Sequence, residues 1–310
     1  MEKIVTITLN PSIDKSTSVK GIVPEKKLRC AEPKFEPGGG GVNVSRAIKK
    51  LGGNSTAFYF AGGYSGKFLT SLLDLEGIDS LVVPIEQATR ENMIVVDELN
   101  NLQYRFGVPG PKVKPEELEH FFKLLAGMKD VDYVVASGSL PEGVEDDFFS
   151  KLADICKLTN ARLIVDTSGE PLRKAINEGV FMIKPNLGEL SMLNGVEELN
   201  DADVVTSARS IINKGGAEVI VVSMGASGAS LVTKDEIFYC PSPAVRKKST
   251  VGAGDTMVAG IVLAMSNEYS WQDVLRYGVA AGTATTMNSG TELCKKNDVD
   301  RLFSYLKKYG

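Results

Sequence analysis

The chain has 310 residues, 43% of them hydrophobic and 24% charged, a globular composition that excludes a disordered or fibrous protein. The formal net charge of −4 gives no broad basic surface of the kind that binds nucleic acid. No apolar run is long enough to span a bilayer, and the first residues do not have the pattern of a signal peptide. We therefore expect a cytoplasmic protein with neither nucleic-acid nor membrane partners.

Cysteine and histidine are scarce, and this limits the chemistry that the chain can perform. The four cysteines are far apart and form no C-x-x-C pair, so we expect reduced thiols without a structural bridge. His120 is the only histidine, which excludes a metal site of the Cys/His type. We expect it on the exposed side of an amphipathic helix. A general base has to be a carboxylate, or else a lysine or tyrosine.

Short apolar runs alternate with amphipathic stretches along the chain. The strand-like runs are Ile4–Leu9, Thr56–Phe60, Leu81–Ile85, Tyr133–Ala136, Arg162–Asp166, Phe181–Ile183 and Glu218–Ser223. Helical spacing is found in Val44–Leu51, Glu116–Leu125, Val204–Ile212, Met257–Met265 and Lys295–Lys308, and Trp271 is expected to start a helix. This alternation predicts an α/β fold, with a mostly parallel sheet covered by helices on both faces.

Two stretches break the alternation, Ser12–Lys34 and Thr89–Val108, because they look extended and lack a helical pattern. In the second stretch Asn100 and Asn101 lie between apolar runs, which predicts a hairpin turn. We interpret residues 12–34 and 89–108 as a small β lid. It would project from a body made of residues 1–11, 35–88 and 109–310. Active sites of open α/β sheets lie at the carboxyl ends of the strands, where such a lid could cover them.

The segment Ser249–Thr256 contains Gly252-Ala253-Gly254-Asp255 immediately before a small and apolar helical run. Two glycines let the backbone turn tightly, so that amide groups at the helix start can face an anion such as a phosphoryl group. Asp255 beside that anion hole suits a base that takes the proton from an attacking hydroxyl. The alternative is that Asp255 only caps the helix.

A second glycine-rich segment, Phe35–Asn43, has four consecutive glycines before a helical pattern. Glycines permit a close approach of backbone to a ligand, and Asn43 could bind sugar hydroxyls. The alternative is a flexible linker, although a linker would not lead directly into a patterned helix.

A third segment, Lys184–Glu189, follows a predicted strand. Asn186 and Glu189 would share one side of the first helical turn, and their hard oxygen atoms suit Mg²⁺, often through water. The alternative is an ordinary capped helix. Since the chain has neither a Walker A loop nor a placed G-x-G-x-x-G, any phosphate chemistry is not of the P-loop or dinucleotide-binding kind.

Together, in this order and spacing, these three segments resemble the ribokinase-like carbohydrate kinases, and within them the phosphofructokinase-B group. The resemblance covers essentially the whole chain. The stretches most similar to the 6-phosphofructokinases of that group are Lys27–Cys30, Phe35–Asn43, Thr89-Arg90, Gln103–Phe106, Ser137–Pro141, Ser249–Asp255 and Gly278–Gly282. One departure is Glu292, where the family has arginine. It reverses the charge beside the family's monovalent-cation site, of which Asn288 and Gly290 remain.

The resemblance implies a three-layer α/β/α body, a β-sheet lid that pairs into a homodimer, and MgATP as cofactor, with K⁺ as a further ligand. It implies Asp255 as the base and Gly252, Ala253 and Gly254 as the anion hole. The sugar phosphate would be bound by Asp14, Lys27, Arg29, Gly39, Asn43, Arg90 and Ser139. The nucleotide would be bound by Lys184, Asn186, Ser223, Gly225 and Gly228, with Asn186 and Glu189 holding Mg²⁺ through water.

The implied reaction is transfer of the γ-phosphoryl group of MgATP to the 1-hydroxyl of fructose 6-phosphate. The lid cations agree with a phosphorylated acceptor, since Lys27, Arg29 and Arg90 stand out in a chain of negative net charge, although they could also be solvated surface charges. The alternatives are tagatose 6-phosphate or fructose 1-phosphate as acceptor, and a non-catalytic sugar-phosphate sensor. A vitamin or nucleoside kinase would leave the lid cations unexplained.

Overall fold

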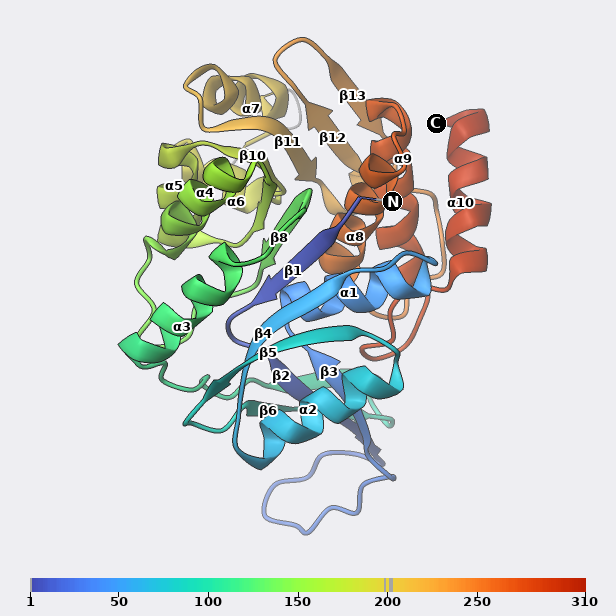
Figure 1. Cartoon of the computed structure of the whole chain (residues 1–310). Coiled ribbons are helices and arrows are strands. Elements are labelled where there is room, and N and C mark those ends of the chain that lie inside the picture. The colour runs from blue at the N-terminus through green and yellow to red at the C-terminus, as the bar shows by residue number, and fades with distance from the viewer. Residues whose placement is uncertain (1, 198, 201–202) are drawn as a thin grey trace.

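The computed structural model describes residues 2–197, 199–200 and 203–310 (Figure 1). Within these residues the larger sheet has nine strands in the order β13-β12-β11-β10-β9-β8-β1-β4-β5. Strands β5 to β11 of this order run parallel, and β12 and β13 return antiparallel at one edge. The strands are β1 Ile4–Thr8, β4 Thr56–Gly62, β5 Asp79–Ile85, β8 Tyr133–Ser137, β9 Arg162–Asp166, β10 Val180–Ile183, β11 Ala217–Ser223, β12 Ala229–Val232 and β13 Ile237–Cys240.

Helices cover both faces of this sheet, as Figure 1 shows. The helices are α1 Gly40–Lys50, α2 Gly63–Leu75, α3 Pro115–Ala126, α4 Phe148–Thr159, α5 Gly169–Glu178, α6 Leu187–Leu193, α7 Val204–Asn213, α8 Ala253–Ser266, α9 Trp271–Thr286 and α10 Lys296–Tyr309. Successive strand residues pack on opposite faces: Ile4 and Val135 lie in the core with α1, α8, α9 and α10, whereas Val5 and Val134 lie in the core with α3 to α7. The expected α/β/α body is confirmed.

A smaller sheet of four strands, in the order β3-β2-β6-β7, forms the lid within the described residues. Its strands are β2 Ser12–Val19, β3 Lys34–Gly38, β6 Arg90–Asp97 and β7 Leu102–Phe106. The expected hairpin joins β6 to β7, with Asn101 in the left-handed conformation at φ 52°. Strand β3 pairs with β2, so the small sheet also includes residues 35–38, which the sequence analysis assigns to the body.

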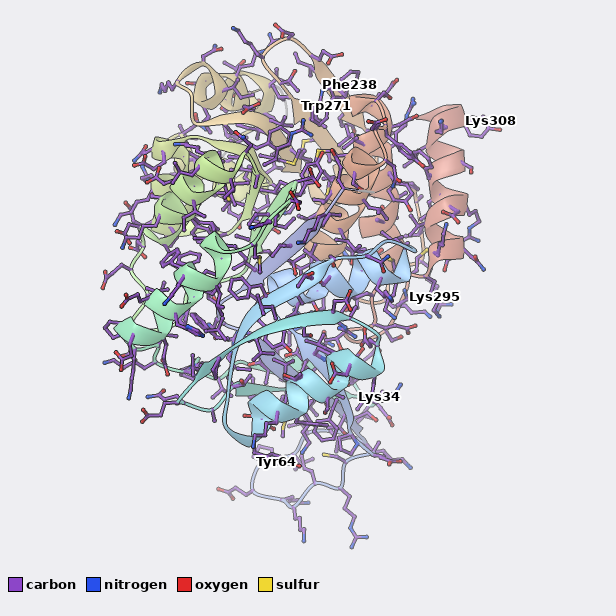
Figure 2. The ribbon with its side chains drawn as sticks, in the orientation of Figure 1. Lys34, Tyr64, Phe238, Trp271, Lys295 and Lys308 are labelled. Atoms are coloured by element: carbon purple, nitrogen blue, oxygen red, sulfur yellow. The ribbon has the colours of Figure 1, made fainter. Side chains whose placement is uncertain are left out.

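The loop of residues 20–33 differs from the sequence-based expectation of extended β structure. It contains no strand beyond an isolated bridge between Val19 and Cys30. Gly21 at φ 104° and Glu25 at φ 59° turn the chain away from the sheet, and the charged run that follows is exposed. Figure 2 shows the side chains of this loop extending into solvent beyond the small sheet.

The remaining sequence-based expectations for the body agree with the structure. All four cysteines are free thiols, and only Cys30 is exposed. His120 is exposed on α3, and α9 starts at Trp271. Among the described residues, every helix is too short or too polar to cross a membrane.

Candidate active site

The start of α8 has an open first turn that faces the carboxyl ends of the parallel strands. Its N-cap residue, Gly252, takes the left-handed conformation at φ 71°, and no side chain caps the first turn. The first amide groups of a helix lack intrahelical acceptors, and they carry partial positive charge. The Ala253 amide is partly used, since it donates to the Thr250 carbonyl oxygen at 3.4 Å. The anion hole expected at Gly252, Ala253 and Gly254 stays a prediction.

Asp255 lies in this first turn with its carboxylate held by two neighbours. Its Oδ2 atom accepts a hydrogen bond of 2.9 Å from Nδ2 of Asn43, and its Oδ1 atom accepts one of 3.5 Å from the Ser137 hydroxyl. Burial raises the pKa of Asp255 to about 6, with the negative charge of Asp166 adding to the rise. The hydrogen bond from Asn43, the charge of Lys184 and the Ser137 hydroxyl lower the pKa in part. A carboxylate with this pKa is ionised at neutral pH and is more basic than an exposed one.

Lys184 forms a buried ion pair with Asp166, which sequence reasoning does not single out. The Lys184 Nζ atom is 3.2 Å from Oδ1 of Asp166, and Lys184 is only 6% exposed. Burial alone would lower the pKa of Lys184, but the negative charges of Asp166, Glu189 and Asp255 raise it, so the side chain stays cationic. Asp166 ends a strand whose bounds the sequence gives, and this position at the carboxyl edge is the signal that could have revealed it.

A pocket of about 500 Å³ lies beside the α8 start, between the β11–β12 loop and α9. Ser223, Gly225 and Gly228, which the resemblance implies as nucleotide contacts, line it together with Ala253 and Gly254. The structure adds residues that sequence reasoning missed, because they come from α9 and from the segment before α8: Ser242, Pro243, Ala244, Val245, Lys247, Thr250, Val279, Gly282, Thr283 and Thr286. The pocket is of the size that encloses small-molecule cofactors.

Asn186 and Glu189 form a capping box at the start of α6. The Asn186 side chain accepts from the Glu189 amide at 2.9 Å, and Oε2 of Glu189 accepts from the Asn186 amide at 2.8 Å. The capped helix, which the sequence analysis gave as the alternative to a magnesium site, is therefore present. Both residues still have oxygen lone pairs free for water, because each cap uses only part of the side-chain acceptor capacity.

The glycine run brings α1 against the ends of β1 and β8. A Cβ atom on Gly40 would lie 2.2 Å from the Ser137 hydroxyl, and one on Gly41 would lie 2.3 Å from the Ile7 carbonyl oxygen. α1 thus begins inside the run, four residues before the expected helix, and no flexible linker is present. Asp14 lies close by, since a Cβ atom on Gly38 would be 2.6 Å from its Oδ2 atom. Gly39 takes φ 112°, which favours glycine.

Arg90 belongs to a polar cluster at the junction of lid and body. Its guanidinium donates to the Asn10 carbonyl oxygen at 2.9 Å, and the Asn10 side chain donates to the Ser139 hydroxyl at 3.1 Å. The Nε atom of Arg90 is buried without a partner, and burial lowers the pKa of this side chain while Asp14 raises it. The structure thus brings together Arg90, Ser139 and Asp14, and adds Asn10 to them.

Lys27 and Arg29 do not join this cluster within the chain. Both side chains are exposed on the loop of residues 20–33. In the cation-site segment, Glu292 forms an ion pair of 3.4 Å with Lys295, so the reversed charge is met by a neighbouring lysine. The Gly290 carbonyl oxygen accepts a hydrogen bond from the Ser249 hydroxyl at 2.7 Å.

A larger hollow of about 950 Å³ lies away from Asp255, near the amino ends of β9, β10 and β11. Trp271, labelled in Figure 2, is one of its lining residues. Because ligands of open α/β sheets bind at the carboxyl ends of the strands, we assign the chemistry to the smaller pocket.

Comparison with known proteins decides the family. Residues 1–298 match the model of the pfkB family of carbohydrate kinases. The chain belongs to this family. It is 42% identical over 302 residues to the ATP-dependent 6-phosphofructokinase isozyme 2 of Mycobacterium tuberculosis, covering 97% of this chain and 89% of that protein. It is 41% identical over 309 residues to the isozyme 2 of Escherichia coli, covering 99% and 100%.

Solved structures agree with this assignment. The potassium complex of E. coli phosphofructokinase-2 superposes with a TM-score of 0.95 at 41% identity, covering 99% of this chain and 100% of that one. The same E. coli protein has also been solved with fructose-6-phosphate, and in a tetrameric inhibited form. Ribokinase from Thermotoga maritima, at 20% identity, a TM-score of 0.77 and coverage of 98% and 100%, shares the fold. The ribokinase-like fold and the carbohydrate kinase activity expected from the sequence are confirmed.

Proposed function

We propose that this carbohydrate kinase transfers the γ-phosphoryl group of MgATP to the 1-hydroxyl of fructose 6-phosphate, with Asp255 as the base. One observation carries the proposal: the Asp255 carboxylate lies between a pocket of nucleotide size and a cluster with a half-buried arginine. Gly254 lines the pocket on one side. On the other side Ser137 contacts the carboxylate, and Ser139 in the same turn is bonded to Asn10, which binds Arg90.

The arginine favours an acceptor that already carries a phosphate. Within the described residues, Arg90 forms no ion pair with a carboxylate, and its Nε atom has no hydrogen-bond partner. Asp14 is the negative charge that acts on Arg90, but it forms no direct ion pair with it, so a partly buried guanidinium remains that suits a ligand with an anionic group. A guanidinium can bind two phosphate oxygens at once, and the Ser139 hydroxyl would add a third contact.

The remaining groups suit an in-line transfer that depends on positioning and electrostatics. Asp255 removes the proton of the acceptor hydroxyl. The amide groups at the start of α8 and the Lys184 ammonium group, which lies beside Gly254, would stabilise the negative charge that develops. Asn186 and Glu189 retain oxygen acceptors that fit the water shell of Mg²⁺, and this ion would neutralise the phosphate oxygens of the nucleotide. A monovalent cation near Gly290 is a further part of the proposal, and comparing turnover in potassium and choline salts tests it.

The lid sheet supports a homodimer. β7 is an edge strand whose residues are all exposed, and Leu102, Tyr104 and Phe106 share one face of it. Met93 of β6 pairs with Phe106 and extends this apolar face, on which each of the four side chains is at least 38% exposed. An exposed strand edge next to an apolar face is a typical pairing surface. Phe106→Lys should convert a dimer to a monomer in sedimentation, and an unchanged mass would contradict the proposal.

An ADP-release assay tests the acceptor. The purified protein is given MgATP with fructose 6-phosphate, tagatose 6-phosphate, fructose 1-phosphate and free hexoses in parallel. We expect the highest kcat/KM with fructose 6-phosphate and little turnover of free hexoses. A preference for another phosphate would reassign the substrate, and binding without ADP release would indicate a sensor. The cytoplasmic location stays a prediction, which cell fractionation would check.

A further inference from the structure

Arg46 is a buried cation in the middle of α1, the helix that also carries Asn43. It is 2% exposed, and sequence reasoning assigns it no role. It lies three residues after Asn43, and residues at this spacing are neighbours on a helix surface. A charged side chain is rarely buried so completely unless its partners require it.

All three guanidinium nitrogens of Arg46 are bound. Nε donates to both carboxylate oxygens of Glu76 at 3.0 Å, and NH2 donates to Oε1 of Glu76 at 2.7 Å. NH2 also lies 3.5 Å from Oε1 of Glu36, and NH1 donates to the Pro37 carbonyl oxygen at 2.8 Å. Contacts from the end of α2 and from lid strand β3 therefore fix the guanidinium plane.

The fixed guanidinium also faces the Asn43 carboxamide. NH1 of Arg46 donates to Oδ1 of Asn43 at 3.4 Å, while Nδ2 of Asn43 donates to Asp255 at 2.9 Å. The opposite amide orientation would direct an NH₂ group at the guanidinium and an oxygen at the carboxylate, so both contacts would become repulsive. Only one of the two orientations satisfies both ends.

We infer that Arg46 is a positioning residue, which holds the Asn43 carboxamide in the orientation that donates to the Asp255 carboxylate. The inference rests on the proposed role of Asp255 as base. The groups that act on this carboxylate are Asp166, Lys184, Ser137 and Asn43. The hydrogen bond from Asn43 favours the ionised form, so a freely rotating amide would leave the base protonated at higher pH.

The test compares Arg46→Lys, Asn43→Ala and the double variant. Lysine keeps the charge opposite Glu76, but a single ammonium group cannot contact Glu76, Pro37 and Asn43 together. The measurement is the acidic limb of the pH profile of kcat/KM for the sugar phosphate. We expect each single variant to move this limb to higher pH, by roughly half a unit to one unit, as for the loss of one hydrogen bond. The double variant should move it no further than Asn43→Ala alone.

Arg276→Lys is the matched control. That guanidinium is also largely buried, with Asp273 and a carbonyl oxygen as partners, and it has no contact with Asn43. It should lower the melting temperature without moving the limb. If Arg46→Lys does not fold, Glu76→Gln replaces it. This change weakens the contact between Arg46 and the more exposed Glu76, and it should give a smaller shift of the limb to higher pH.

Two results would overturn the inference. One is an acidic limb that does not move in Arg46→Lys, or in Glu76→Gln if that variant replaces it. The other is a double variant whose shift equals the sum of the Arg46→Lys and Asn43→Ala shifts. Asp255→Asn separates this failure from that of the proposed function. If Asp255→Asn keeps its rate, the base assignment itself is wrong. If it loses the rate and the limb while Arg46→Lys shifts nothing, only the role of Arg46 is wrong.

Discussion

The start of α8 and the lid contribute to the same candidate site, but they are built in different ways. Around Asp255, the side chains are held by contacts within the chain. Asn43 and Ser137 donate to the Asp255 carboxylate, and Lys184 is paired with Asp166. In the lid, Arg90 is fixed against Asn10, whereas Lys27 lies exposed on a loop. The residues proposed for phosphoryl transfer are thus held in place within the chain, and those proposed to bind the sugar phosphate are only partly brought together.

The strongest test of the preorganised half is Asp255→Asn. This change keeps the shape but removes the base, and general bases contribute about 10²–10⁴-fold to rate. We expect kcat to fall by that factor, measured by ADP release, with nucleotide affinity unchanged by calorimetry. A wild-type rate in a folded Asp255→Asn variant would show that Asp255 is not the base.

In the lid, Arg90→Ala should raise the KM for the sugar phosphate about 10- to 100-fold, because charge-assisted hydrogen bonds are each worth about 1.5–3 kcal/mol. The KM for ATP should change little, as the pocket beside α8 does not include Arg90. Arg90→Lys keeps the positive charge but cannot bind two phosphate oxygens at once, so its KM for the sugar phosphate should lie between those of the wild type and Arg90→Ala. Equal effects on both substrates would argue against a phosphate contact.

The pH profile tests how strongly the body perturbs its base. Since burial raises the pKa of Asp255 to about 6, kcat/KM should fall about tenfold per unit as pH drops below this value. Ionisation of Asp255 should raise activity but lower the stability of the fold, because its pKa is higher in the folded than in the unfolded chain. Asp255→Asn should therefore raise the melting temperature at pH 8, and should raise it less at pH 5. A limb near pH 4 would show that the pocket does not desolvate this carboxylate.

The smallest effect is expected for Lys27→Ala, compared with Lys26→Ala as matched control. Both side chains are exposed on the same loop. If Lys27 reaches the sugar phosphate in the closed or dimeric lid, its loss should raise the KM for that substrate several-fold, as for one exposed charge contact. Lys26→Ala should leave it unchanged. Equal KM values for the two variants would make Lys27 a surface charge.

The sequence predicted the body well because its strands are buried on both faces and stand out as apolar runs. It singled out Asp255 and the glycine run because glycines before a helix mark tight backbone geometry, and the roles assigned to these residues stay predictions. It did not predict β12 and β13, the antiparallel pair at one edge of the sheet. Asp166, Asn10 and Arg46 were not singled out, since their partners are distant in sequence and only the fold brings them close.

The loop between β11 and β12 has a consequence for the shape of the pocket beside α8. β12 runs back antiparallel to β11 after a single turn of 3-10 helix at Gly225–Ser227, so this connection needs no crossover helix. The β11–β12 loop itself, with Gly225, Ala226 and Gly228, therefore lines the pocket. On this side the pocket is bounded by a three-residue turn and not by a crossover helix. Lengthening that turn should reduce the space in the pocket while the pairing of β11 with β12 stays intact.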